Sequence, residues 1–311
     1  MTDTSPARFR GVLVPASTPF AADLSPDAGR FNAFCSWLLD EGADGLAIFG
    51  TTSEANSVGM ADRMRLTEGL VESGVPAAKL LPGTGMCALA DSVAMTKHAV
   101  ELGCGGVLVL PPFYYKNPSD DGLYASFAEL IERVGDKRLQ LYLYHFPQMA
   151  GVGIPMGVIE RLVKAYPETV GGLKDSSGDW SNTEAVIKNF PSLHTFPSSE
   201  SRAVDALKIG GAGCISASAN INVRAIRALI DVWDKPEADA LNEKVSAVRG
   251  IMEGYPIIAA VKAVLAEFGG DEEWNRVSPP LVTLPAEKRA ALISALKAEG
   301  FSLSMPVSKA A

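Results

Sequence analysis

The chain has 311 residues, of which 47% are hydrophobic and 21% charged, an ordinary globular composition that excludes disordered, collagenous and coiled-coil proteins. The formal net charge is -8, and no basic cluster offers a field for nucleic acid or an anionic membrane. Four scattered cysteines, and a polar segment 1–10 without the apolar core of a signal peptide, predict a cytoplasmic protein with reduced thiols.

Short apolar runs rich in β-forming residues alternate with longer stretches of helical period. The runs recur at intervals of roughly 20 to 35 residues, the size of one βα unit. They predict eight parallel strands, over residues 11–16, 45–49, 79–82, 106–110, 139–144, 170–174, 193–196 and 213–216.

The segments between these strands repeat apolar residues three and four positions apart, for example in 31–39, 63–71, 89–102 and 123–134, which is typical of amphipathic helices. Eight strands with crossover helices predict an α/β fold, a TIM (β/α)8 barrel. A doubly wound sheet is the alternative, because a strand count does not reveal closure.

After Ile221 the strand pattern stops, and three helical stretches follow at 238–249, 257–267 and 286–298. Prolines at 279, 280 and 285 mark a break between the last two. The sequence therefore predicts a barrel domain over residues 1–226 that carries the active site, and a C-terminal helical extension over residues 227–311.

Lys174 stands at the carboxyl end of the apolar strand 170–174, where barrel enzymes place their chemistry. Burial removes the hydration of an ammonium group and favours the neutral amine, which attacks a ketone to form a Schiff base. An ion pair with Asp175 is the structural alternative, but side chains of adjacent strand residues point to opposite faces.

Three other strand ends carry polar or aromatic groups. The turn 50–54 presents Thr51 and Thr52, whose hydroxyl and N–H groups suit either a carboxylate or a helix cap. Tyr114 and Tyr115 follow the fourth strand and Tyr144 ends the fifth. Phenols at these positions fit either packing or a substrate site.

The sequence offers no recognisable metal or nucleotide site. His98, His145 and His194 are too far apart, and lack the neighbouring cysteines or carboxylates of a metal centre. The glycine-rich stretch 210–213 precedes the last strand, so a turn at the opposite end of the barrel is the better interpretation. Neither GxGxxG after a strand nor GxxxxGK[ST] occurs.

Five ordered motifs resemble the dihydrodipicolinate synthase and N-acetylneuraminate lyase family over nearly the whole chain: 50–54, 82–85, Tyr114 with Tyr115, Tyr144 with Pro147, and 172–175. The resemblance implies the barrel with a helical tail and a class I mechanism, in which Lys174 forms an imine with pyruvate or another 2-oxo acid. No metal or organic cofactor is then needed. Thr51 and Thr52 would bind the carboxylate of the 2-oxo acid, and Tyr144 would be the acid and base.

Further roles follow from the same resemblance. Tyr115 resembles the phenol that a neighbouring subunit inserts to complete a relay with Thr51 and Tyr144, which implies a homotetramer built as a dimer of dimers. Ile215 resembles a position whose backbone carbonyl faces substrate, although a plain core residue fits equally well. Ser198 and Glu200 match a region that contacts sugar hydroxyls in the sialic acid lyases, but Glu200 also suits a helix N-terminus.

Two departures bear on the substrate. Met149 stands where true dihydrodipicolinate synthases carry an arginine for the aldehyde carboxylate, and a thioether cannot hold that group. Ser53 replaces the usual glycine of its motif.

The sequence thus predicts a pyruvate-dependent aldolase or lyase acting on a 2-oxo acid, such as a 2-keto-3-deoxy sugar acid, with an aldehyde as the second small molecule. The alternatives are dihydrodipicolinate synthase (4-hydroxy-tetrahydrodipicolinate synthase) itself, a related dehydratase that expels water from the same imine, and a non-catalytic 2-oxo acid sensor.

Overall fold

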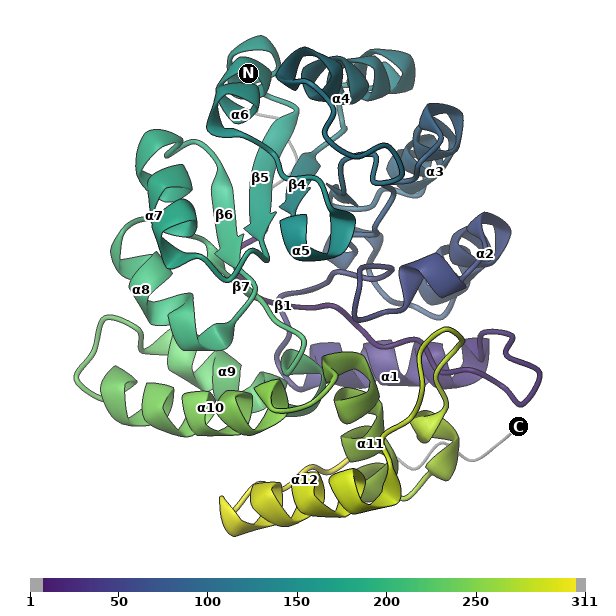
Figure 1. The fold of residues 1–311 in the computed structure, drawn as a ribbon, viewed down its shortest axis with the longest axis vertical. Helices are drawn as coiled ribbons and strands as arrows, with labels where there is room; N and C mark the ends of the chain where they lie inside the picture. The colour runs from purple at the N-terminus through teal and green to yellow at the C-terminus, as the bar shows by residue number, and fades with distance from the viewer. Residues whose placement is uncertain (1–7, 306–311) are drawn as a thin grey trace.

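The computed structural model describes residues 8–305, with short parallel strands at the centre and helices around them (Figure 1). The strands form two hydrogen-bonded groups, in the orders β2-β1-β7 and β3-β4-β5-β6. Their bounds are Gly11–Val14 (β1), Gly45–Leu46 (β2), Val107–Val109 (β3), Leu141–His145 (β4), Val170–Asp175 (β5), His194–Pro197 (β6) and Gly213–Ile215 (β7).

The predicted strand at 79–82 joins the two groups without becoming a regular strand. Leu80 pairs with Leu46 of β2, and Gly83 pairs with Leu108 of β3, both in parallel. Pro82 has no N–H group to donate, which interrupts the ladder on the side of β3. The segment therefore holds the place of a barrel strand with only isolated bridges.

The second junction between the two groups of strands lies between β6 and β7. There the Ala212 N–H donates to the Thr195 carbonyl oxygen at 2.9 Å. This bond and the bridges of the segment 80–83 close the sheet on itself. The prediction of a TIM barrel is confirmed, and the doubly wound sheet is excluded because an open sheet would leave two unpaired edges.

Helices follow the strands in barrel order and surround them (Figure 1). They are Ala28–Asp40 (α1), Met60–Glu72 (α2), Leu89–Glu101 (α3), Asp120–Val134 (α4), Met156–Ala165 (α6), Trp180–Asn189 (α7), Ala203–Lys208 (α8) and Ala219–Asp231 (α9). Shorter turns of helix are Pro147–Ala150 (α5), Ala55–Ser57 (η1), Ala77–Lys79 (η2), Glu200–Arg202 (η3) and Glu272–Asn275 (η4). Ser119 and Asp27 cap α4 and α1 by accepting hydrogen bonds from backbone N–H groups of the first turn.

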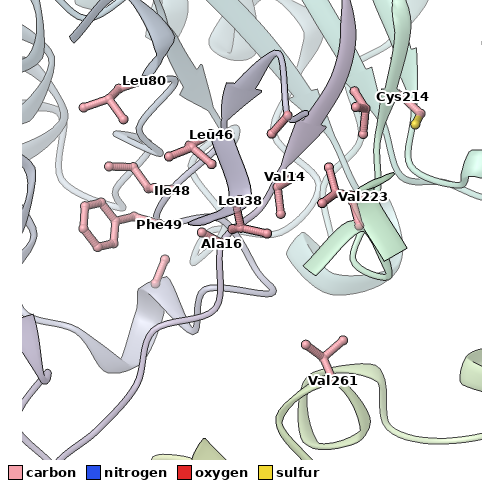
Figure 2. Packing of buried hydrophobic residues seen from close by; sticks show 14 of the residues in the cluster. Val14, Ala16, Leu38, Leu46, Ile48, Phe49, Leu80, Cys214, Val223 and Val261 are labelled. Atoms are coloured by element: carbon pink, nitrogen blue, oxygen red, sulfur yellow. The ribbon is translucent and has the colours of Figure 1, made fainter. Parts of the chain in front are cut away.

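Strand residues alternate between two apolar layers, as the period of two requires. Val12 and Val14 pack outward against helices, in one large cluster, whereas Leu13 belongs to a smaller cluster inside the barrel. Figure 2 shows Val14 in the outer layer, with Val261 of the C-terminal helices pointing toward it. The interior cluster also holds Tyr142 and Tyr144 of β4, so β4 directs its phenols inward.

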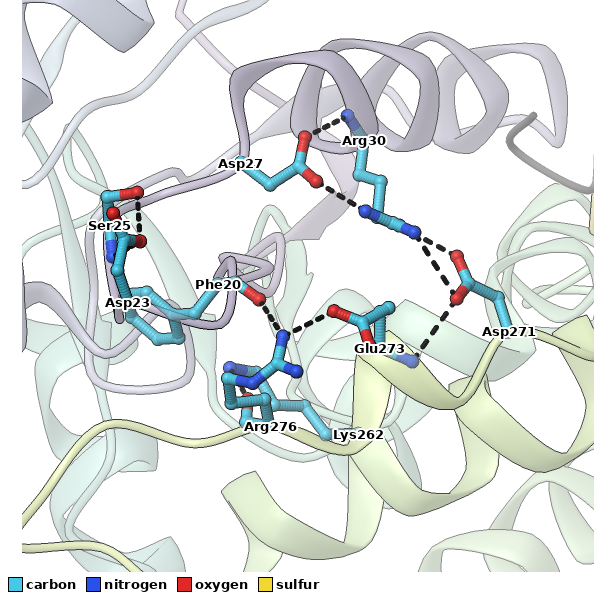
Figure 3. A network of polar contacts seen from close by, with 9 residues as sticks. All are labelled: Phe20, Asp23, Ser25, Asp27, Arg30, Lys262, Asp271, Glu273 and Arg276. Carbon is cyan, nitrogen blue, oxygen red and sulfur yellow. Dashed lines mark hydrogen bonds and ion pairs between the residues drawn. The ribbon is translucent and has the colours of Figure 1, made fainter. Parts of the chain in front are cut away.

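The C-terminal extension contains Ala238–Glu253 (α10), Ile257–Gly269 (α11) and Ala286–Ala298 (α12), which lie together at one side of the barrel (Figure 1). A polar network ties it to the first barrel loop and α1 (Figure 3). Arg30 bonds Asp271 at 2.7 Å, and Arg276 donates to the Phe20 carbonyl oxygen at 2.7 Å. The domain boundary at residue 226 falls within α9 and stays a prediction.

In the described range no helix combines the length and apolar character needed to cross a bilayer. Most of the segment 1–10, from which a cytoplasmic location was predicted, lies outside the described residues.

The close approach of the paired strands β1 and β7 requires a glycine at position 213. A Cβ atom at Gly213, where φ is +134°, would lie 1.9 Å from the Gly11 carbonyl oxygen. We expect Gly213→Ala to lower the free energy of unfolding in urea by about 3 kcal/mol, through strain and overpacking. As control, Gly250→Ala in α10 meets nothing within 4 Å and should raise it by about 0.5 to 1 kcal/mol, because alanine favours helix. A Gly213→Ala protein as stable as wild type would contradict this close approach of β7 to the Gly11 carbonyl oxygen.

Candidate active site

The parallel ladder between β4 and β5 brings Tyr144 and Lys174 together. Their Cα atoms are register partners, and both side chains face the barrel interior near its carboxyl end. The Lys174 Nζ lies 3.4 Å from the Tyr144 hydroxyl and 4.5 Å from the centre of that ring. The amine and the phenol are therefore close enough to exchange a proton.

Lys174 is 4% exposed, and Tyr144 is its hydrogen-bond partner among the described residues. Asp175 points away, accepting hydrogen bonds from the Asn182 amide and the Thr183 hydroxyl, each at 2.8 Å. The alternation argument against a Lys174–Asp175 ion pair is confirmed. The buried Lys174 side chain thus lies beside a phenol rather than a carboxylate.

The turn 50–54 extends this contact. The Thr51 Oγ1 lies 3.1 Å from the Tyr144 hydroxyl, which links Thr51, Tyr144 and Lys174 in one line of polar atoms. The N–H groups of Thr51 and Thr52 donate to no residue that the structure describes. Free N–H groups and a hydroxyl at one turn provide what a carboxylate needs.

The turn is bracketed by two strained residues, Phe49 with φ +57° and Glu54 with φ +54°. Side chains other than glycine adopt such angles at a cost of about 1 to 3 kcal/mol, so the surroundings must hold them. Gly83 permits the close approach at one end, since a Cβ there would lie 2.0 Å from the Phe49 carbonyl oxygen. Thr18 holds the middle, donating its hydroxyl to the Ser53 carbonyl oxygen at 2.7 Å.

Glu54 is held from the C-terminal extension. Its carboxylate forms an ion pair with Lys262 of α11, and both side chains are 0% exposed. The Ser278 N–H donates to the same carboxylate at 2.9 Å, and Lys262 donates to the Arg276 carbonyl oxygen at 2.7 Å. Burial lowers the pKa of Lys262 to about 8, against the opposing pull of Glu54.

A cavity of about 630 Å³ opens over the turn 50–54, Tyr144 and Lys174. Six of the predicted site residues line it: Thr51, Thr52, Tyr144, Lys174, Ser198 and Ile215. Ile215 is fully buried within the interior cluster. The barrel thus brings most of the candidate side chains to one space, while their individual roles stay predictions.

Glu200 lies apart from this cavity. It is fully buried, and its carboxylate accepts hydrogen bonds from the hydroxyls of Ser216 and Ser218. Arg249 of α10 approaches it at 3.7 Å and itself lines the cavity. In this arrangement Glu200 fixes Ser216, Ser218 and Arg249 rather than facing the open space.

Tyr115 and Tyr114 lie on the loop after β3, 75% and 74% exposed, with their rings in edge contact 5.4 Å apart. Neither lines the cavity within one chain. Lys116 anchors this loop by donating to the Ala150 carbonyl oxygen at 2.9 Å. Two large aromatic side chains are therefore held out toward solvent on a tethered loop.

The remaining candidates have structural contacts. His145 accepts a hydrogen bond from the Ile154 N–H at its Nδ1, and burial lowers its pKa. His98 pairs with Glu68 at 2.7 Å, and His194 bonds the Phe9 carbonyl oxygen at 2.8 Å. Over residues 8–305, no cluster of three or more His, Cys, Asp or Glu is arranged to hold a metal ion.

The two residues that depart from the motifs, Met149 and Ser53, lie in different surroundings. Met149 in α5 is 62% exposed and lines the cavity. The Ser53 hydroxyl is buried and lacks a hydrogen-bond partner among the described residues.

The chain matches the model of the dihydrodipicolinate synthetase family over residues 8–299. It is 34% identical over 292 residues to an uncharacterized DapA-like lyase of Chloroflexus aurantiacus, covering 93% of this chain and 96% of the relative. The solved dihydrodipicolinate synthase from Agrobacterium tumefaciens superposes with a TM-score of 0.86 at 29% identity, covering 93% and 98% of the two chains. YagE from E. coli K12 shares the fold, with a TM-score of 0.86 at 24% identity over 95% and 100%.

A closed barrel with a buried lysine, a phenol and a threonine at its carboxyl end, together with these matches, defines a lyase of the class I aldolase type. The chain belongs to the dihydrodipicolinate synthetase family.

The sequence motifs did not indicate three contributors to the site. Lys262 lies within an apolar helical run, and only its complete burial marks it as the partner of Glu54. Arg249 and the loop 280–285 also line the cavity, and both belong to the C-terminal extension, in which no motif indicated a site residue. A charged residue on the apolar face of the predicted helix 257–267 was the one signal available.

The Glu54–Lys262 pair predicts a large stability effect. Lys262→Met leaves a buried, uncompensated carboxylate, so we expect the free energy of unfolding in urea to fall by about 3 to 5 kcal/mol. Lys297→Met is the matched control, because Lys297 meets Glu267 at 3.3 Å but is 58% exposed, and it should change stability by less than about 1 kcal/mol. Adding Glu54→Leu to Lys262→Met should recover much of the loss. Equal stability of the two single variants would contradict this account.

Proposed function

We propose that this chain is a pyruvate-dependent aldolase or lyase in which Lys174 forms an imine with the ketone carbon of a 2-oxo acid. The observation that carries the proposal is the line of polar atoms from Thr51 through Tyr144 to Lys174, with spacings of 3.1 Å and 3.4 Å, at the base of an open cavity. A buried amine without a carboxylate partner is suited to attack a carbonyl.

Imine formation uses these groups in order. The Lys174 amine adds to the C2 ketone, and the resulting alcohol leaves as water after taking a proton, which the Tyr144 phenol is placed to supply. The carboxylate of the 2-oxo acid accepts hydrogen bonds from the free N–H groups of Thr51 and Thr52. This orientation places carbons C3 and C4 in the cavity above Tyr144.

The protonated imine then acts as an electron sink. In cleavage, Tyr144 takes the proton of the C4 hydroxyl, the C3–C4 bond breaks, and its electrons form an enamine on Lys174 while an aldehyde departs. Protonation of C3 and hydrolysis release pyruvate and the free amine. The reverse sequence forms the bond, and a dehydratase would instead expel the C4 hydroxyl as water from the same imine.

The proposal extends to assembly and location. Tyr115 of one subunit would enter the site of its neighbour and complete the relay with Thr51 and Tyr144, in a homotetramer built as a dimer of dimers. Its 75% exposure on a tethered loop supports a role outside its own barrel. Four unpaired cysteines, three of them buried, fit a reducing cytoplasm.

Dihydrodipicolinate synthase itself is the second candidate, and the name of the Agrobacterium relative supports it. Met149 weighs against it, because its exposed thioether lies on the cavity wall where an arginine would hold the aldehyde carboxylate. Arg249 also lines the cavity, but its guanidinium bonds Ser216 at 3.1 Å and Glu253 at 2.7 Å.

Borohydride trapping tests the imine directly. After incubation with pyruvate and reduction, peptide mass spectrometry should find the adduct on Lys174, and Lys174→Ala should lose both adduct and turnover. Lys188→Ala, at a side chain 59% exposed, should lose neither. Tyr144→Phe should still be trapped, while its turnover falls about 10²-fold for want of the acid and base. A fully active Lys174→Ala enzyme would end the mechanism, and trapping without turnover of any substrate would favour the sensor.

Subunit mixing tests the shared site. Lys174→Ala and Tyr115→Phe chains, each impaired alone, should regain activity after exchange, because one site of a mixed pair combines an intact Lys174 with the neighbour's intact Tyr115. Mixing Lys174→Ala with Tyr144→Phe is the control, since both residues belong to the same barrel and no intact site can form. Absence of any gain in the first mixture would contradict the role of Tyr115 across the interface.

A further inference from the structure

The C-terminal extension builds one wall of the cavity. The start of α11, residues 256–259, and the loop 280–285 before α12 both line it. This wall is almost wholly apolar, with Ile257, Ile258, Leu281, Val282 and Leu284 among its members. The outer part of the cavity is therefore shaped by residues far in sequence from Lys174.

The segment after β4 adds apolar side chains to the lining. Phe146 and Met149, which follow β4, line the same cavity as the extension. The Phe146 ring lies 5.9 Å from the Tyr144 ring with an interplanar angle of 32°. An aromatic surface thus continues outward from the catalytic phenol.

Two of these side chains are unusually exposed for their type. Val282 is 78% exposed and Met149 is 62% exposed, and both line the same cavity. Large apolar side chains left open to water at a cavity mouth mark a surface that a ligand covers.

Hydrogen-bonding groups are concentrated at the inner end, where Thr51, Thr52, Tyr144 and Lys174 lie. Beyond them the cavity offers few hydroxyls, chiefly those of Ser176, Ser198 and Thr283.

The carboxylate predicted for polyol recognition, Glu200, is engaged by Ser216 and Ser218 outside the lining. Of the two outer cations, Arg249 is engaged by Glu253 and Ser216, and Lys288 lies exposed at the rim. A polyhydroxylated chain would leave most of its hydroxyls without partners here, which costs binding energy.

We propose that the outer half of this cavity binds an apolar, aromatic aldehyde as the partner of the 2-oxo acid, and that Ile257 and Val282 determine this specificity. The inference rests on the proposed function of Lys174. At about 630 Å³ the cavity has the size of sites for drug-sized ligands, well beyond what pyruvate fills. A flat ring buries large apolar area with little loss of conformational freedom.

The reaction balances without a further reagent. Carbon C3 of the enamine on Lys174 attacks the aldehyde carbon, and the aldehyde oxygen takes the proton of Tyr144. Water then hydrolyses the imine, releasing a 4-aryl-4-hydroxy-2-oxo acid and the free amine. The aryl group remains between Phe146 and the wall of the extension throughout.

The test compares benzaldehyde with glyceraldehyde, both uncharged, each supplied with saturating pyruvate. We expect kcat/KM for benzaldehyde to exceed that for glyceraldehyde by at least about 10-fold, the discrimination of a well-fitted apolar pocket. A preference for glyceraldehyde, or equal rates, would overturn the inference.

Variants locate the specificity. Val282→Asn and Ile257→Asn should each lower the ratio of kcat/KM for benzaldehyde to kcat/KM for glyceraldehyde about 10-fold. Leu24→Asn is the control, because Leu24 is 40% exposed on the loop before α1, outside the cavity lining, and its φ of +67° suits asparagine. Equal losses with both aldehydes, or no loss, would overturn the assignment of these residues.

The pyruvate trap separates this inference from the function on which it depends. A reduced pyruvate adduct on Lys174 without a preference for benzaldehyde overturns the substrate class alone. Failure to form any adduct, with folding confirmed by circular dichroism, overturns the proposed function and this inference together.

Discussion

The site depends on one buried ion pair between parts of the chain that are distant in sequence. Glu54 ends the turn that presents Thr51 and Thr52, and it adopts a left-handed backbone conformation that isolated glutamate disfavours. Lys262 of α11 neutralises its carboxylate, and the Ser278 N–H completes the contact. Because neither charge reaches water, separating the extension from the barrel would leave both uncompensated. The helical tail thus helps to hold the turn that carries Thr51 and Thr52.

The second constraint is the alternation of side chains along parallel strands. It directs Lys174 and Tyr144 into the barrel as register partners and directs Asp175 outward to Asn182 and Thr183. The same geometry fills the opposite end of the barrel, where the Tyr142 hydroxyl accepts the Phe9 N–H at 2.9 Å. One strand therefore supplies two phenols two residues apart, one bonded to the Phe9 backbone and the other beside Lys174.

Much of this arrangement was predictable. Short apolar runs predicted the strands and the helical period predicted the helices, and strand-end position alone singled out Lys174. The third strand was placed correctly, but Pro82 kept it from forming a regular ladder. Glu200 illustrates the limit, since the family resemblance left a sugar contact and a helix N-terminus both open, and no motif indicated the two serine hydroxyls that the fold brings to its carboxylate. Which atoms meet depends on neighbours that local sequence does not specify.

The sequence by itself determined the alternation of strands and helices, the family and which candidate residues stand at the strand ends, because each follows from local period or from short motifs. The tertiary structure alone decided that α11 and the loop 280–285 line the cavity, that Lys262 neutralises Glu54, and that the outer surface of the site is apolar. The Glu54–Lys262 contact joins residues more than 200 positions apart. Burial and pairing across such separations depend on how the folded elements pack, and no local pattern encodes them.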